Sequence, residues 1–350
     1  MIAAAPRDVL NVTVETTPDD WTRYVASRAD ATGYHEWPWR QVFKRAFDHE
    51  SIYLAVRREG ELVGVLPLVL LDSWLFGRAL ISLPFLNYGG VIADDDRAAA
   101  ALLEQAVALA RTHRCRHVEL RHSKQVFAAL PCKRHKVAML LTLQPPTALW
   151  ESLDRKVRNQ VRKAQKSGLT FQSGDGELLD SFYDVFARNM RDLGTPVFPR
   201  ALFERVLTDV ADTRAYIVRS GDTPIAAGIT VAYRGTVENI WASSLREYRA
   251  QCPNMLLYWT MIEDAVRAGR QTFDFGRSTP GEGTYHFKKQ WGATEAPFAW
   301  EYAFSSANGH ELPSGSASSK VALATSMWKR LPLPVANAIG PAIARGCAFL

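Results

Sequence analysis

The sequence predicts an α/β protein of two domains, each a mixed sheet flanked by helices. Three observations lead to this expectation. The chain has 350 residues, which is long for one domain and ordinary for two. Helical and β-rich patterns alternate, and the second half repeats the first: helices, a strand meander, a helix and further strands. Hydrophobic residues make up 47% and charged residues 22%, which favours a sizeable core and argues against extensive disorder.

In the first half, acidic Asp19 and Asp20 open a helix, where the helix dipole favours negative charge. Glu59-Gly60-Glu61 separates two β-rich runs and predicts a hairpin. The full predicted order is helices at 18–29 and 39–47, strands at 52–57, 62–71 and 80–83, an alanine-rich helix that follows 94–96 and ends near 112, and closing strands at 118–121 and 137–143.

Pro145-Pro146 breaks the pattern and is the predicted linker, so we expect domains at 1–144 and 147–305. The predicted elements of the second half are helices at 147–166, 178–193 and 200–211, strands at 215–219, 224–233 and 237–243, a helix at 255–268, a strand at 272–275, a short helix at 285–290 and a last strand at 298–304. From Ser305 the composition changes to Ser, Ala, Gly and Pro. We therefore expect 306–350 to be a mobile tail, in which 321–330 forms one amphipathic helix.

Charge and cysteine content bound the cellular context. The net charge of +6 suggests an anionic ligand or surface. The four cysteines show no CxxC spacing, which argues against a disulfide framework or structural zinc and favours a reducing compartment. We see no signal peptide and no unbroken apolar span, so a cytoplasmic location is expected. Lys320, Lys329 and Arg330 flank an apolar segment of the tail, which suggests a peripheral contact with the inner membrane.

Residues 153–168 predict a strongly basic amphipathic helix. At about 100° per residue, its apolar residues share one stripe: Leu153, Val157, Val161 and Ala164. Gly168 follows as the expected C-cap. Six cations against one acid are expected to attract an anion, because the arginine fork suits phosphate; a merely solvated basic face is the alternative. The residues predicted to bind are Arg155, Arg158, Arg162 and Lys163.

A glycine-rich stretch at 273–292 is the second candidate. A strand is expected to end at Phe275, followed by a loop whose glycines allow close backbone approach and whose amides can hold an anion. The predicted binding residues are Gly276, Arg277, Ser278, Gly283, Thr284 and Lys288. Tyr285 and Asp274 are the predicted catalytic residues, and Glu238 is a further carboxylate considered as base. A tight turn before an ordinary helix is the alternative. Asp274-Phe275-Gly276 also spells a kinase metal motif, but its companion motifs are absent.

The third candidate is the junction after the strand that includes Trp241. Asn254 stands before an apolar helix and is the predicted N-cap. Trp241 and Asn254 are therefore added to the predicted binding residues. No metal site is expected, because His113, His117 and His122 share no constant face.

These stretches together resemble the FemAB-related proteins, GNAT-like acyl and aminoacyltransferases, in particular the branch associated with exosortase (PEP-CTERM) and exopolysaccharide gene clusters. The resemblance covers about residues 10–305 and rests on 150–168, on 253–259, and on 273–278 with 283–288. It implies tandem GNAT-like (acyl-CoA N-acyltransferase) domains, with the main cleft in the second. In that fold an acyl-CoA pyrophosphate lies on a loop and a helix N-terminus after a splayed strand, and 245–253 lacks the glycines usual there.

The activity that the resemblance implies is acyl or aminoacyl transfer to an amine of a polysaccharide or cell-envelope precursor. Acyl-CoA or aminoacyl-tRNA would be the co-substrate, with no permanently bound cofactor, and nucleic acid would be a partner only with the second donor. One alternative is a non-catalytic module that binds an anionic glycan or lipid-linked precursor. Another is an RNA-binding module, although the helix from Arg155 to Lys166 has no aromatic residue to stack on bases.

Overall fold

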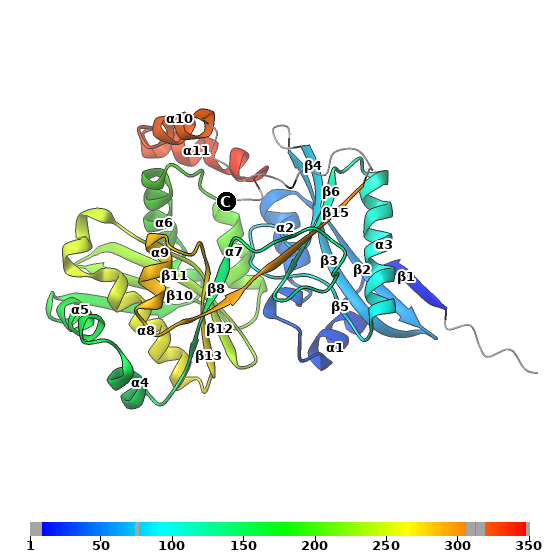
Figure 1. Cartoon of the computed structure of the whole chain (residues 1–350). Coiled ribbons are helices and arrows are strands. Elements are labelled where there is room, and N and C mark those ends of the chain that lie inside the picture. The colour runs from blue at the N-terminus through cyan, green and yellow to red at the C-terminus, as the bar shows by residue number, and fades with distance from the viewer. Residues whose placement is uncertain (1–8, 74–76, 306–311, 313–318, 348–350) are drawn as a thin grey trace, which may run out of the picture. The chain divides into compact units, whose positions relative to one another are not determined.

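The computed structural model describes residues 9–73, 77–305, 312 and 319–347. The chain forms two compact units (Figure 1). Unit 1 consists of Met1–Lys133, Ala299–Ser314 and Gly346–Phe349. Unit 2 consists of Arg134–Phe298, Gly315–Arg345 and Leu350.

Unit 1 contains a mixed sheet. Its strands are, in spatial order, β1 (Leu10–Val14), β2 (Glu50–Arg58), β3 (Glu61–Ser73), β4 (Gly77–Ile81), β6 (His117–His122), β15 (Ala299–Phe304) and β7 (Cys132–Lys133), with β5 (Ile92–Ala93) beside β3. Only β4 and β6 are parallel neighbours in this sheet of the described residues. The helices are α1 (Asp19–Ser27), η1 (Gly33–His35), α2 (Trp39–Phe47) and α3 (Asp96–Thr112).

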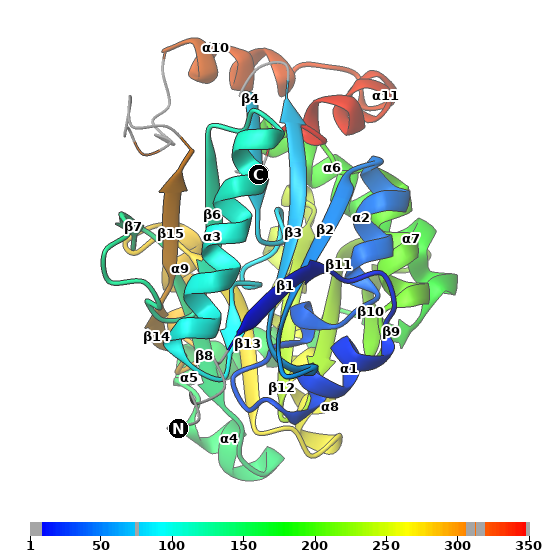
Figure 2. The same ribbon diagram turned by 90° about the vertical axis from the view of Figure 1, so that its right-hand side faces the viewer.

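Helices cover the unit 1 sheet because its central strands are apolar on both faces. Leu54 and Val56 of β2 belong to the core under α3, which lies along β3 and β6 in Figure 2. Tyr53, which points to the other face, packs on Trp21 of α1 with ring centroids 4.7 Å apart. Asp95 caps α3 by accepting the Ala98 N–H at 2.9 Å, as its acidic start predicts.

Unit 2 contains the second mixed sheet. Its strands are, in spatial order, β14 (Thr294–Pro297), β8 (Val137–Thr142), β13 (Thr272–Ser278), β12 (Thr236–Ser244), β11 (Thr223–Tyr233), β10 (Thr213–Ser220) and β9 (Leu169–Gly174). The helices are α4 (Pro146–Ser152), α5 (Arg155–Lys166), η2 (Gly176–Leu178), α6 (Leu179–Leu193), α7 (Arg200–Asp209), η3 (Arg246–Gln251), α8 (Pro253–Arg267), α9 (Gly283–Lys289), α10 (Ser319–Trp328) and α11 (Leu333–Ala344).

Alternate residues of β12 contact different helical layers. Ala242 packs against the core cluster that includes α5 and α8. Trp241 contacts Phe203 of α7 at 5.0 Å between ring centroids, and Ser243 Oγ accepts a hydrogen bond from Asn189 of α6 at 3.0 Å. The sheet of unit 2 is therefore covered on both faces, and the predicted class of mixed sheets flanked by helices is confirmed.

Two strands exchange places relative to the sequence prediction. The run expected to close the first domain, β8, pairs with β13 and β14 in unit 2. The run expected to close the second domain, β15, pairs with β6 and β7 in unit 1. The linker predicted at 145–146 therefore lies inside unit 2. Either strand is apolar enough for either sheet, so chain order alone does not decide the pairing.

Other elements also differ from the prediction. The single helix expected at 147–166 is two helices, because Leu153 is extended (φ −67°, ψ 144°) and Asp154 starts α5 by accepting the Lys156 N–H at 2.6 Å. The strands β1, β9 and β14 were not predicted. The tail expected to be mobile contains α10 and α11 in its described part. Ala336 and Ala344 of α11 are buried, and α11 packs on α6.

None of the helices in the described ranges is both long and apolar enough to cross a membrane.

Candidate functional site

The strands β12 and β13 of unit 2 separate along their length. They are parallel neighbours only from the pair Thr236 and Thr272 to the pair Glu238 and Asp274. Beyond that point β12 stays with β11 as far as Ser244, while β13 stays with β8 as far as Ser278. The predicted splay in the sheet is therefore present, and it opens a place where a ligand can approach backbone that has no neighbouring strand.

The end of β13 carries a bulge that requires glycine. The register with β8 shifts between Asp274 and Arg277, and Gly276 has φ 72°. Asp274 stabilises the bulge, because its Oδ1 accepts the Gly276 N–H at 2.7 Å. The strand continues to Ser278, so the prediction that it ends at Phe275 is wrong. Gly276, Arg277 and Ser278 therefore lie in a bulged strand and not in the loop that the sequence predicts.

Lys288 of α9 reaches the bulge. Its Nζ donates to Gly276 O at 3.1 Å and to Arg277 O at 2.8 Å, and the residue is 8% exposed. Burial lowers the pKa of Lys288 to about 8, although Asp274 and Glu238 act in the opposite direction. An ammonium group with a lowered pKa, held by backbone carbonyls at a splayed sheet, is typical of a reaction centre.

Two further polar groups lie at the end of β13. Ser278 is 3% exposed, and its Oγ has no hydrogen-bond partner among the described residues. Lys136, just before β8, donates to Thr279 Oγ1, and burial lowers its pKa. An unpaired buried hydroxyl is costly, which indicates that a ligand or water completes its hydrogen bonding.

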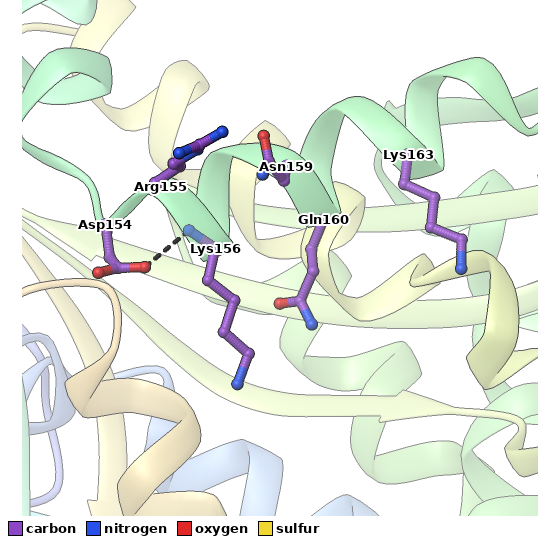
Figure 3. A pocket seen from close by; sticks show the side chains of 6 residues that line it. All are labelled: Asp154, Arg155, Lys156, Asn159, Gln160 and Lys163. Atoms are coloured by element: carbon purple, nitrogen blue, oxygen red, sulfur yellow. Dashed lines mark hydrogen bonds between the residues drawn. The ribbon is translucent and has the colours of Figure 1, made fainter.

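Two surface hollows lie beside the start of α5. The first, of about 470 Å³, is lined by Asp154, Arg155, Lys156, Asn159, Gln160 and Lys163 (Figure 3). In Figure 3 Lys156, Gln160 and Lys163 extend to one side of the helix. The second, of about 870 Å³, is lined by Ser152, Asp154, Lys156, Val157, Gly283, His286, Phe287, Lys289, Gln290 and Gly292. Because both are lined by Asp154 and Lys156, they adjoin and connect the basic helix α5 with α9.

The basic helix has the predicted faces. Val157, Val161 and Ala164 are buried, and Gly168 has φ 71° directly after the C-cap. Only part of the predicted anion-binding set lies at a hollow, however. Arg155 and Lys163 line the first hollow, whereas the Arg162 guanidinium lies over the Trp150 ring at 5.3 Å and lines neither. Arg158 is half-buried and also lines neither hollow.

The glycine-rich stretch is divided between two places. Gly276, Arg277, Ser278 and Lys288 gather at the bulge, while Gly283 lines the second hollow. Thr284 is exposed on α9. Tyr285 is buried, and its hydroxyl donates to Glu295 Oε1 and accepts from Lys289 Nζ at 3.1 Å.

Neither residue of the third predicted candidate, Trp241 or Asn254, lines either hollow. Trp241 packs in the core against Phe203. Asn254 lies inside the first turn of α8, and the N-cap is Cys252 with φ 59°, so the predicted N-cap is wrong. The cause is Pro253, which is favoured at the first helical position, so the helix starts at Pro253, before Asn254.

Sequence reasoning missed several residues of the site. Asp154 and Gln160 line the hollows, and Asp154 could have been found from the preference for Asp at helix N-caps. Lys136 and Glu295 had no sequence signal, because β8 and β14 bring them to the site only through long-range pairing. Within the part of the chain that the structure describes, no group of three His, Cys, Asp or Glu is placed to hold a metal ion.

Comparison with known proteins supports this description. Residues 152–289 match the family model of the acetyltransferase (GNAT) domain, Acetyltransf_6. This range includes the basic helix, the splayed strands and α9, and it covers less than half of the chain. No curated protein matches the chain by sequence.

Three solved structures have a similar fold. The crystal structure of FemX has a TM-score of 0.65 at 17% identity, over 83% of this chain and 96% of that one. The C-terminal domain of a putative lysylphosphatidylglycerol synthetase from Agrobacterium fabrum has a TM-score of 0.58 at 14% identity, over 88% of this chain and 94% of that one. A tandem GNAT protein from the clavulanic acid biosynthesis pathway has a TM-score of 0.57 at 13% identity, over 86% of this chain and 100% of that one. Residues 152–289 of unit 2 are therefore similar to the acetyltransferase (GNAT) domain, and the chain as a whole has the fold of tandem GNAT proteins.

Proposed function

We propose that this protein is an N-acyltransferase that moves an acyl or aminoacyl group to an amine where β12 and β13 of unit 2 separate. The observation that carries the proposal is Lys288, a buried ammonium held by the carbonyls of Gly276 and Arg277; the next residue, Ser278, has a buried hydroxyl without a partner among the described residues. The acetyltransferase match supports this location, because it includes both strands and Lys288.

In such a transfer the amine nitrogen attacks the donor carbonyl carbon, and the carbonyl oxygen becomes an oxyanion. The intermediate then collapses: the bond from the carbonyl carbon to the donor's oxygen or sulfur breaks, the leaving group takes up a proton, and the former amine nitrogen gives its proton to water. We assign Lys288 to the oxyanion, because a cation in a water-poor site stabilises developing negative charge strongly. A pKa of about 8 would also let Lys288 give a proton to the leaving group near neutral pH.

The predicted catalytic residues enter the proposal through their contacts. Asp274 holds the bulge through Gly276 and attracts the Lys288 ammonium. Tyr285 fixes α9 through Glu295 and positions Lys289 at the second hollow. A direct part in proton transfer for Asp274 or Tyr285 stays a prediction.

The first hollow, beside α5, is the proposed site for a phosphate of the donor or acceptor. Arg155, Lys156 and Lys163 line it, and arginine and lysine are the side chains that bind phosphate most often. In contrast, the N–H groups of Tyr248 and Cys252 are bonded within the turns before α8. That segment therefore offers fewer free N–H groups to a coenzyme A pyrophosphate than an open glycine loop would. This favours a donor whose phosphate binds at α5. Aminoacyl-tRNA and acyl-CoA are the two donor classes to compare.

For the acceptor, we propose an amine of a polysaccharide or cell-envelope precursor. This choice, and the link to exopolysaccharide and PEP-CTERM systems, rests on the sequence resemblance. The alternative is a non-catalytic module that binds an anionic glycan or lipid-linked precursor. One observation favours it: the Asp274 carboxylate and the Tyr285 hydroxyl are both already hydrogen-bonded inside the unit.

The test is a mass-spectrometric assay of transfer. The protein is incubated with acyl-CoA or aminoacyl-tRNA donors and amino-sugar acceptors, and the acceptor mass is recorded. We expect an increase equal to the transferred group less one hydrogen, and far less of this product in the same time with Lys288→Met. If the wild-type protein binds a phosphorylated donor or acceptor on α5 and transfers nothing, the non-catalytic reading replaces this proposal.

A further inference from the structure

The helix α11 buries one stripe of small residues and exposes a stripe of large apolar ones. Ala336, Gly340 and Ala344 form the buried stripe. A Cβ atom at Gly340 would lie 3.0 Å from the backbone nitrogen of Val197, so the close packing on this part of unit 2 favours glycine there. The stripe next to it, about 100° around the helix, consists of Val335, Ile339 and Ile343, which are 43%, 43% and 38% exposed.

The preceding helix α10 is attached in the same manner. Thr325 packs against Gly194, at the end of α6, where a side chain would not fit. Leu323 and Met327, one turn apart, are 63% and 62% exposed. Figures 1 and 2 show both helices at the same end of unit 2 as α6. Of the ten large apolar side chains that are exposed in the described ranges, five lie on α10 and α11.

The charged side chains of this segment itself are all positive. From Leu312 to Leu350 the sequence contains no Asp or Glu, and it contains four cations: Lys320, Lys329, Arg330 and Arg345. Lys329, Arg330 and Arg345 are exposed. An acid-free segment that combines exposed aliphatic side chains with cations has the composition of a helix that lies on anionic lipid.

We propose that unit 2 binds the surface of an anionic lipid bilayer through the α10–α11 face, defined here as Leu323, Met327, Val335, Ile339 and Ile343 with Lys329, Arg330 and Arg345. The apolar side chains enter the boundary between headgroups and acyl chains, and the cations contact lipid phosphates. Twelve residues of α11 span only about 18 Å, so the helix lies on the bilayer and does not cross it.

The charges decide between a bilayer and a second copy of this chain. Two such faces in contact would bring Lys329 and Arg330 of one copy toward the same cations of the other, with no acid in the segment to compensate. A bilayer that contains phosphatidylglycerol supplies the missing negative charge. The proposal does not depend on the transfer reaction, since it concerns helices outside the acetyltransferase match.

The test is co-sedimentation of the full chain with vesicles, without any turnover assay. We compare vesicles of phosphatidylcholine with vesicles of phosphatidylcholine and phosphatidylglycerol. We expect binding to the anionic vesicles, at least about tenfold weaker partitioning for Ile339→Ser/Ile343→Ser, and a similar loss for Lys329→Glu/Arg330→Glu. Phe171→Ser, which removes another exposed apolar side chain of unit 2, is the matched control and should leave partitioning unchanged.

All of these side chains are exposed, so the variants should keep the thermal midpoint of the wild-type protein, and this is measured alongside. Equal partitioning of the wild-type protein and Ile339→Ser/Ile343→Ser would overturn the proposal. So would equal binding to neutral and anionic vesicles. A dimer in analytical ultracentrifugation that these two substitutions dissociate would assign the face to a second copy instead.

Discussion

Among the described residues, each unit contains one pair of parallel strands that separate, and different groups lie at the two separations. In unit 1, β4 and β6 are paired only at Leu80 with Val118 and at Ile81 with Glu119. The segment after β4 then follows β6 in place of a strand. Ser82 N–H donates to Glu119 O at 2.8 Å, and Gly90 N–H donates to Arg121 O at 3.1 Å.

The buried charges at the unit 1 separation are paired with one another. Arg121 and Glu119 are both fully buried, and Arg121 Nε donates to Glu119 Oε1 at 2.8 Å. His122 accepts the Val91 N–H at Nε2, so its Nδ1 carries a proton and donates to Glu301 at 2.5 Å. In unit 2, by comparison, Lys288 is held by backbone carbonyls and the Ser278 hydroxyl has no partner among the described residues.

The comparison shows that separated strands do not by themselves make a site. In unit 1 the chain's own residues 82–91 occupy the edge of β6. In unit 2 the buried cation Lys288 has two backbone carbonyls, and no carboxylate, as hydrogen-bond partners among the described residues. If this difference is functional, substitutions of buried charges should cost stability in unit 1 and activity in unit 2.

The largest effect is expected for Arg121→Met. It leaves the buried Glu119 carboxylate without its partner and removes the Arg121 Nη1 donor to Leu86 O. We expect the free energy of unfolding to fall by about 3–5 kcal/mol, measured by denaturant titration. Glu119→Gln/Arg121→Met should recover part of the loss, and the exposed Arg23→Met should change little. A loss of less than about 1 kcal/mol for Arg121→Met would break the comparison.

The next effect concerns Lys288→Met in unit 2. We expect kcat for amine acylation to fall by about 10²–10³-fold, because the oxyanion loses its cation, while the protein stays folded by circular dichroism. Lys133→Met is the matched control, since Lys133 is a partly buried lysine of unit 1 whose pKa is also lowered by burial. Comparable losses of kcat in both variants would show that the two units do not differ as argued.

A smaller effect is the pH dependence of stability. The folded-state pKa of Lys288, about 8, lies below its ordinary value of 10.5, so between these values the unfolded chain binds a proton that the native protein does not. The free energy of unfolding of the wild-type protein should therefore rise relative to Lys288→Met, by roughly 2–3 kcal/mol over this window. Parallel pH profiles of the two proteins would contradict the burial of the ammonium.

The smallest effect is expected on α5. Arg155→Glu/Lys163→Glu should raise the KM for a phosphate-bearing substrate about tenfold, and the increase should shrink at high salt because the cations are exposed. Lys166→Glu, on the same helix and outside both hollows, is the control. Equal KM values for the wild-type protein, the double variant and Lys166→Glu would show that the cations of α5 bind no phosphate and are only solvated.

Local signals explain what could be predicted from the sequence. The helix at 39–47 has the predicted bounds, and Val157, Val161 and Ala164 form the predicted buried stripe, because both follow from residue spacing within one element. Lys288 is among the predicted binding residues because it lies close in sequence to Gly276 and Gly283. The exchange of β8 and β15 was not predictable, because pairing partners more than 100 residues apart leave no periodicity in the chain.

The parts of the site that could not be predicted depend on the same distant pairings. Lys136 reaches the bulge only because β8 lies beside β13, and Glu295 reaches Tyr285 only because β14 lies beside β8. The helix α11 was missed for another reason: it is apolar on both its buried and its exposed face, so no amphipathic period marks it.

The exchange of β8 and β15 also has a consequence for biosynthesis. The ribosome releases the N-terminal end first, yet the sheet of unit 1 lacks β15 until Phe304 has emerged. The sheet of unit 2 is complete once β14 has emerged at Pro297. The sheet that begins first is thus finished last, and during translation the growing chain holds an incomplete first sheet while the second assembles. A gene divided at the Pro145-Pro146 codons would yield one fragment without β15 and another without β8.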